Sequence, residues 1–282
     1  MNEITIDCPA KINLSLDILG KREDGYHEIS TIMQTISLYD KVKIKKSNDF
    51  RITVKGANLP LDDNNIALKI AKVMMKKYNI QGGVEINIEK NIPVAAGLAG
   101  GSSDAAGVIL GINEIYDLNL SDNELMDIGA LVGSDVSYLI KRGTALCTGR
   151  GEKVETLKSL TGHKVLIAKP NISVSTKWVY DNLNLKAIEN KPNTKLLVSF
   201  IENNDIDSIS KNLLNVLETV TITKYKVIDE IKNFMKNNGS IGSIMSGSGP
   251  TVFGIFKDDS INYCFNELKK VHSEVYMAEM TN

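Results

Sequence analysis

A loop of small residues carries the strongest chemical signal in this sequence. It runs from Pro93 to Ala106 as PVAAGLAGGSSDAA, with three glycines and two serines close to a predicted helix start. Glycine lets a bulky anion come close to the backbone, and the first N–H groups of a helix have no partner inside the helix. Because those amides also carry partial positive charge, the loop predicts a phosphate-binding site.

The plain alternative is an ordinary glycine-rich turn in which Ser102 or Ser103 caps the helix. The common phosphate loops do not match, because no lysine follows the glycines as a P-loop requires. Gly97, Gly100 and Gly101 do not fit the G-x-G-x-x-G dinucleotide pattern, and the partner motifs of a protein kinase are missing. We therefore expect a nucleotide-phosphate loop of another lineage.

Phosphoryl transfer also needs a group that neutralises charge and one that takes or orients the acceptor proton. Lys11 and Asn13 fall on the same polar face of an alternating stretch, and Asp135 follows Gly133-Ser134 before an apolar run. From spacing alone, a solvated lysine and a carboxylate in the first turn of a helix are the commoner roles. A second loop of small residues, Ser246 to Pro250, reads as a hairpin turn.

The elements that position these residues can be predicted from apolar spacing. Strands and helices are mixed along the chain, which predicts an α+β fold in two layers rather than a doubly wound sheet. Predicted strands cover residues 4–6 up to a break at Pro9, and residues 11–18, 84–89, 144–148, 165–168, 243–245, 251–253 and 274–277. Predicted helices follow Asn64, Ser121 (with a capping box to Glu124) and Ser175, another contains residues 105–116, and others fall within residues 196–234.

Composition restricts the class of protein. The chain has 282 residues, 43% of them hydrophobic, and a net charge of −1 from 33 basic and 34 acidic residues. The balanced charge argues against nucleic acid as a partner, and no apolar stretch approaches the length of a membrane span. Three scattered cysteines predict reduced thiols in a cytoplasmic protein.

Taken together, five blocks resemble the GHMP small-molecule kinases, in the same order and over most of the chain. They are PAKINLSLDILGKREDGYHEI from Pro9, PVAAGLAGGSSDAA from Pro93, GSDVSYLI from Gly133, GTALCTGRGE from Gly143 and SGSGPTVFGIF from Ser246. The resemblance implies a two-domain fold. An N-terminal ATP-binding domain of mixed sheet and helices, residues 1–157, would pack on a C-terminal ferredoxin-like domain, residues 158–282.

The first block, with Gly25-Tyr26-His27, is most similar to the members of the family that act on a cytidine-diphosphate-linked methylerythritol. For these members the reaction is ATP-dependent phosphorylation of the 2-hydroxyl, a step in non-mevalonate isoprenoid synthesis, with Mg²⁺ as the metal. Another kinase of the family, for homoserine or mevalonate, and a non-catalytic RNA-binding module are the alternatives. The expected protein is a monomer or homodimer that binds this small molecule, without nucleic acid or membrane.

Residue by residue, the resemblance implies that Asp135 is the catalytic carboxylate and Lys11 the catalytic lysine. Asn13 and Thr176 would contact the substrate, and Tyr26 and His27 would recognise its cytidine. Asn64 would contact adenine. The triphosphate would lie against the run Pro93, Val94, Ala95, Ala96, Gly97, Leu98, Ala99, Gly100, Gly101, Ser102 and Ser103.

The sequence departs from the family pattern at two points. Ser137 stands where a proline is usual, which could loosen the first turn of its helix. No glutamate is evident for a magnesium site, so the phosphates, water and the hydroxyl of Ser102 or Ser103 would hold the metal.

Overall fold

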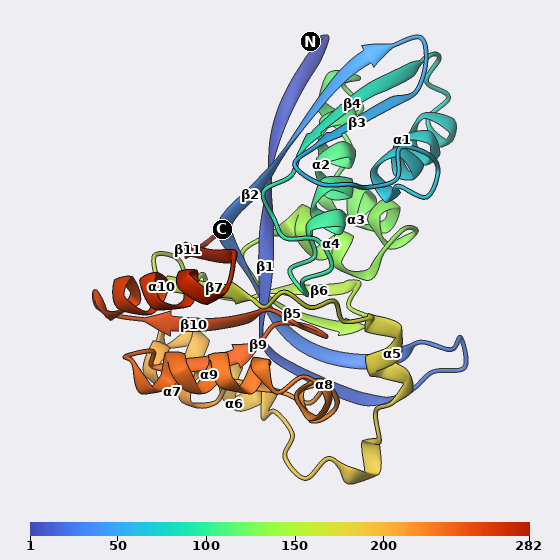
Figure 1. Cartoon of the computed structure of the whole chain (residues 1–282). Coiled ribbons are helices and arrows are strands. Elements are labelled where there is room, and N and C mark those ends of the chain that lie inside the picture. The colour runs from blue at the N-terminus through green and yellow to red at the C-terminus, as the bar shows by residue number, and fades with distance from the viewer.

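The computed structural model describes all 282 residues, in two parts that share one connected sheet (Figure 1). The first part contains β1 (Glu3–Lys21), β2 (His27–Ser47), β3 (Arg51–Lys55), β4 (Gly83–Glu89), β5 (Thr144–Gly149) and β6 (Lys153–Thr156). Its helices are α1 (Ile66–Lys77), α2 (Gly100–Ile115), α3 (Asp122–Ala130) and α4 (Ser134–Lys141).

The second part follows from β7 onward. Its strands are β7 (Lys164–Lys169), β8 (Leu214–Asn215), β9 (Gly242–Met245), β10 (Val252–Phe256) and β11 (Glu274–Thr281). Its helices are α5 (Thr176–Asp181), the 3-10 turn η1 (Leu185–Ala187), α6 (Thr194–Glu202), α7 (Ile206–Lys211), α8 (Glu218–Lys224), α9 (Val227–Asn237) and α10 (Ser260–Val271).

The long antiparallel hairpin β1–β2 runs through the whole molecule and connects the two parts (Figure 1). The predicted break at Pro9 was wrong. Pro9 pairs with Tyr39 inside β1, and the register shifts between Pro9 and Ala10, so an irregularity absorbs the proline and the strand continues. This continuity carries Lys11 and Asn13 into the interior of the protein.

The second part is ferredoxin-like, as expected. Its four main strands lie in the order β11-β7-β10-β9, all antiparallel, and β11 also pairs with β2 through Met280 and Ile36. Helix α10 and strand β3 were not among the predicted elements. The proposed boundary after residue 157 falls in the connection between β6 and β7 and stays a prediction.

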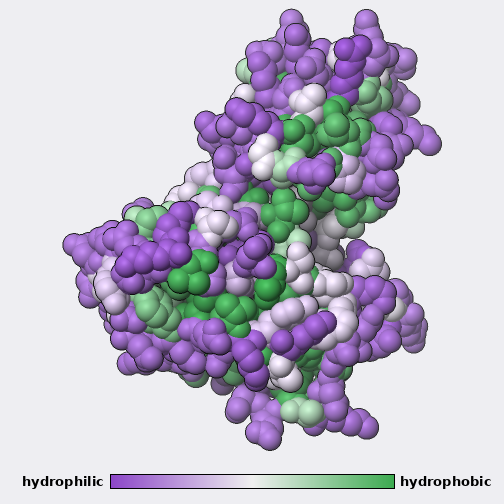
Figure 2. All heavy atoms as spheres, viewed as in Figure 1, coloured by the Kyte–Doolittle hydropathy of each residue, from purple (hydrophilic) through white to green (hydrophobic).

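Burial explains why these elements pack as they do. One apolar core joins α1, α2 and α4 to β2 and β4, and two others lie under the second part. In Figure 2 the ends of both parts are mainly hydrophilic, and hydrophobic residues are visible chiefly along the middle, between them. The capping box of Ser121 with Glu124 and the cap at Ser175 are confirmed.

Candidate active site

A cleft of about 790 Å³ lies where the two parts of the protein meet. Its walls come from β1, the β1–β2 loop, the loop before α2, the start of α4, the β5–β6 turn, α5 and the β9–β10 turn. Among the residues that line it are Lys11, Asn13, Tyr26, His27, Pro93, Val94, Ala95, Ala96, Gly97, Ala99, Gly100, Gly101, Ser102, Asp135 and Thr176. The structure therefore brings most of the predicted site residues together.

Lys11 lies at the centre of the cleft and is almost fully buried. Its Nζ donates to Asn13 Oδ1 at 2.6 Å and to the carbonyl of Gly97 at 2.8 Å, so two of its three hydrogens are committed. The Ser246 hydroxyl donates to the same carbonyl at 3.0 Å. Segments from three distant parts of the chain thus fix the position of one ammonium group.

Asp135 completes this centre from the first turn of α4. Its Oδ2 lies 4.0 Å from Lys11 Nζ, and its side chain is 30% exposed. Burial lowers the pKa of Lys11 from its ordinary value, and the Asp135 charge opposes that shift. A carboxylate open to the cleft beside a buried cation can accept or orient a proton while the cation neutralises developing charge.

The glycine-rich loop achieves its curvature in an unexpected way. Left-handed backbone occurs at Ala95 (φ 52°), Gly97 (φ 74°) and Ala99 (φ 56°), whereas Gly100 and Gly101 are already helical. The alternative with a serine cap is wrong, because α2 begins at Gly100 with Ala99 as its N-cap. A side chain at Gly97 would collide with the Ser246 carbonyl, its Cβ falling 2.2 Å from that oxygen. Glycine is thus required at Gly97 because the two small-residue loops touch.

Gly101 has a different role from Gly97. A Cβ there would meet only the tip of Ile66, at 3.8 Å, so the first turn of α2 stays open to the cleft. Ser102 also lines the cleft, and its Oγ lies 3.7 Å from the Cβ position of Gly133, beside the start of α4. Free amides at the start of a helix, with no side chain in front, are suited to a phosphate group.

Three residues predicted for ATP binding point elsewhere. Leu98 is buried in the core, and the Ser103 hydroxyl donates to the Pro9 carbonyl at 2.7 Å. Asn64 lies outside the cleft, where its side chain donates to Asp62. The buried cap of α1 is the neighbouring Asn65, and the cleft wall in this region is made by Leu59 and Ile66. The side chains of Leu98, Ser103 and Asn64 therefore do not face the cleft.

Aromatic rings occupy the other end of the cleft. Tyr26 is 55% exposed, and the Arg150 guanidinium lies 5.0 Å from the centre of its ring. The rings of His27 and Tyr180 are 5.1 Å apart between centroids, tilted by 40°. Burial lowers the pKa of His27 from its ordinary value, and nearby Lys21 adds to this effect, while Asp181 opposes it. A neutral imidazole beside the half-buried Tyr180 and the exposed ring of Tyr26 suits a heterocyclic base.

Thr176 also reaches the cleft, from the start of α5. Its Oγ1 lies 2.8 Å from the Ser248 Oγ in the β9–β10 turn, so the predicted hairpin turn forms part of the site. Ser137, the residue at the unusual position, is buried, and its hydroxyl donates to the Met126 carbonyl at 2.8 Å. This bond ties α4 to α3.

Several cleft residues were missed by sequence reasoning. They are Tyr180, Arg150, Lys177, Asp181, Leu59 and Ile66. A signal existed for Arg150, which lies in the GRGE turn of a recognised block. Tyr180 had only its helical position, because its contact with His27 depends on how α5 packs against the β1–β2 hairpin.

Few side chains that face the cleft could donate to a magnesium ion. No group of three or more His, Cys, Asp or Glu side chains forms a metal cluster. The Asp135 carboxylate and the Ser102 hydroxyl both line the cleft and are oxygen donors. Because Mg²⁺ keeps several waters and takes oxygens from substrate phosphates, one or two such protein donors fit the ion.

Comparisons with known proteins identify the family of both parts of the chain. The family model for the GHMP kinases N terminal domain matches residues 65–143, and the model for the GHMP kinases C terminal matches residues 197–272. No helix of the structure combines the length and the apolar character needed to cross a membrane.

Similar proteins cover nearly the whole chain. One from Caldicellulosiruptor bescii is 52% identical over 88% of this chain and 87% of its own length. One from Clostridioides difficile is 49% identical over 99% of this chain and 95% of its own length. Both are named 4-diphosphocytidyl-2-C-methyl-D-erythritol kinase. A crystal structure of 4-(cytidine 5'-diphospho)-2C-methyl-D-erythritol kinase matches with TM-score 0.83, 26% identity, and coverage of 99% and 100%. A homoserine kinase from Cytophaga hutchinsonii shares the fold at 20% identity and TM-score 0.80, over 99% and 95%.

Proposed function

This chain belongs to the GHMP kinases, a family of small-molecule kinases, and we propose that it uses ATP to phosphorylate the 2-hydroxyl of 4-diphosphocytidyl-2-C-methyl-D-erythritol. One observation carries the proposal at the level of chemistry. Lys11 and Asp135 meet beside the glycine-rich loop, in a cleft whose other end holds Tyr26 and His27. The cation and the carboxylate thus lie between the proposed site for the ATP phosphates and the proposed site for the cytosine.

The ATP triphosphate lies against the loop before α2. The open first turn at Gly101 and the left-handed backbone at Ala99 leave amides available to the phosphate oxygens. Leu59 and Ile66 offer an apolar wall for the adenine, in place of the Asn64 side chain. Mg²⁺, held by the phosphates and water with the Ser102 hydroxyl as the available protein donor, would neutralise phosphate charge.

The acceptor lies on the other side of Lys11. Its cytosine is recognised by the neutral His27 ring and stacks on exposed aromatic rings, and Arg150 offers positive charge to the diphosphate. The side chains of Asn13 and Thr176 face the sugar alcohol. Through these contacts the cleft orients one hydroxyl toward the γ-phosphorus.

The reaction follows from this arrangement. The 2-hydroxyl oxygen forms a bond to the γ-phosphorus, the bond from that phosphorus to the bridging oxygen breaks, and ADP leaves. Asp135 orients the hydroxyl and accepts its proton, while Lys11 neutralises charge on the transferring group. Because Lys11 is fixed by Gly97 and Asn13 before substrate arrives, little reorganisation is needed in the transition state.

An assay with the purified protein, ATP, Mg²⁺ and the cytidine substrate tests the proposal. We expect ADP release with one phosphate added to the substrate, read by mass spectrometry. Homoserine and mevalonate serve as matched acceptors, and turnover with either of them above that with the cytidine substrate would reject this substrate. A folded protein that releases no ADP with any of the three would reject kinase activity.

A further inference from the structure

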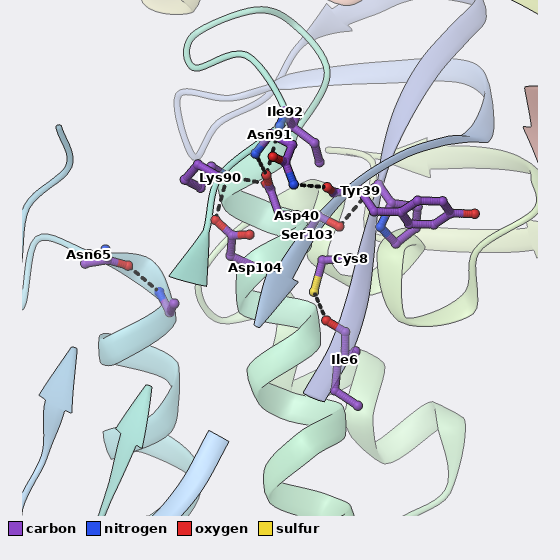
Figure 3. Close-up of polar contacts among 12 residues, drawn as sticks. Ile6, Cys8, Tyr39, Asp40, Asn65, Lys90, Asn91, Ile92, Ser103 and Asp104 are labelled. Carbon is purple, nitrogen blue, oxygen red and sulfur yellow. Dashed lines mark hydrogen bonds and ion pairs between the residues drawn. The ribbon is translucent and has the colours of Figure 1, made fainter. Parts of the chain in front are cut away.

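A buried group of three charged side chains lies directly at the base of the glycine-rich loop (Figure 3). The ammonium of Lys90 pairs with Asp40 of β2 and with Asp104 of α2, the second at 2.7 Å between Nζ and Oδ2. Each of these residues is less than a tenth exposed. Lys90 also lines the cleft, but none of the three has a part in the reaction as described above.

The cluster holds the first residues of the loop. Asp40 Oδ1 accepts hydrogen bonds from the amides of Asn91 at 2.6 Å and Ile92 at 2.8 Å. The Asn91 side chain donates to the Tyr39 carbonyl at 2.9 Å, which adds a second tie to β2. The positions of both backbone amides therefore depend on the position of the Asp40 carboxylate.

The same cluster holds the last residues of the loop. Asp104 lies just beyond the first turn of α2, and the Cβ position of Gly100, the first residue of that helix, is 3.1 Å from Lys90 Nζ. One ammonium group thus contacts β2, to which the first residues of the loop are tied, and α2, where the loop ends. Figure 3 shows the Asp40 and Asp104 side chains pointing toward the Lys90 ammonium from these two elements.

Stability alone is a poor explanation for three charges in this place. Taking ions out of water costs so much that a well-packed apolar set is often as stable. Burial raises the pKa of Asp104, the Lys90 ammonium opposes that rise, and the Oδ1 of Asp104 has no hydrogen-bond partner. Burial alone would lower the pKa of Lys90, but Asp104 and Asp40 outweigh it, so Lys90 stays charged. What the cluster provides is a fixed geometry between β2, the loop and α2.

From these contacts we infer that Lys90, Asp40 and Asp104 are positioning residues that set the loop before α2 for the ATP phosphates. The inference rests on the proposed use of ATP. It concerns the cofactor end of the cleft alone, because the cytidine end is built from the β1–β2 loop, the first residue of β2, α5 and the β5–β6 turn. An error of about 1 Å in the position of such a loop can reduce activity by about a hundredfold.

Substitution of Lys90 tests the inference. In Lys90→Met we expect the KM and the equilibrium Kd for ATP to rise by about tenfold or more. The KM for the cytidine substrate should change by less than about twofold, since its contacts are intact. Hydrogen exchange of the amides from Ile92 to Ala99 should become faster. A general loss of stability would not separate the two KM values in this way.

A matched control is Lys232→Met. Lys232 is a half-buried lysine that pairs at 2.7 Å with Glu218, whose other oxygen accepts the Met245 amide, much as Asp40 accepts loop amides. We expect Lys232→Met to leave the Kd for ATP unchanged. An equal rise in both variants would overturn the inference.

A pair of substitutions at Asp104 keeps the test independent of folding in the Lys90 variant. Asp104→Asn keeps an acceptor for Lys90 without a charge and should preserve the Kd for ATP, whereas Asp104→Leu removes the acceptor at similar volume and should raise it. Equal values for the two variants would overturn the inference. Because Kd and amide exchange need no turnover, a wild-type protein that binds ATP but phosphorylates nothing would reject the proposed function and leave this test intact.

Discussion

The two ends of the cleft are built on different physical principles. At the phosphoryl end, Lys11 is almost fully buried, and the Gly97 carbonyl and the Asn13 side chain fix its position. At the cytidine end, Tyr26 is 55% exposed, and the guanidinium of Arg150 lies over its ring. This difference in burial indicates that the fold preorganises the reacting groups, whereas substrate recognition depends on side chains that can adjust to a ligand.

The largest expected effect comes from removing the carboxylate at the preorganised end. Asp135→Asn should lower kcat by about a thousandfold, because an amide cannot take the acceptor proton. The Kd for ATP should change little, since the loop is untouched. Single-turnover phosphorylation measures the chemical step, and near-normal rates would exclude Asp135 as the proton acceptor.

The control for that variant is Asp122→Asn. Asp122 of α3 also pairs with a lysine, Lys141 of α4, at 2.8 Å, but this pair lies outside the cleft. Its kcat should match that of the wild type. A similar loss in both variants would mean that the effect comes from the stability of α4 rather than from chemistry.

Substitutions at the cytidine end should change the KM for the cytidine substrate rather than kcat. Tyr26→Ala should raise the KM for the cytidine substrate by about tenfold, because stacking of a base on an aromatic ring is worth about 1–3 kcal/mol. The KM for ATP should stay the same. Tyr263→Ala, at another exposed tyrosine far from the cleft, is the control. A fall in kcat without a change in KM would contradict the division between the two ends.

The smallest effect is a pH dependence confined to the cytidine end. Because burial lowers the pKa of His27, the ring is neutral at and above neutral pH. Acidification through this lowered pKa protonates the ring and removes its acceptor nitrogen, so the KM for the cytidine substrate should rise a few-fold as pH falls. The KM for ATP should not follow the same curve. His27→Asn should abolish the dependence, and an unchanged pH profile in that variant would rule out His27 as its source.

Local sequence was sufficient for much of the framework. The alternation that put Lys11 and Asn13 on one face is confirmed by their hydrogen bond, and the cap at Ser175 correctly predicted α5. Local rules failed at Pro9, where pairing with a long partner strand overrides the proline, and at Ala95 and Ala99, where alanines adopt left-handed backbone. In these places contacts with distant segments outweigh local preference.

The sequence by itself determined the kinds of chemistry available: a loop of small residues before a helix, a lone lysine on a polar strand face and an aspartate in a first turn. That these groups meet depends on the fold, because Lys11, Gly97, Asp135 and Ser246 are joined by strand pairing and loop contact rather than by spacing. The same holds for Lys90, whose two carboxylates lie 50 and 14 residues away in the chain. Burial of polar groups requires partners, and those partners come from whichever elements the fold brings together.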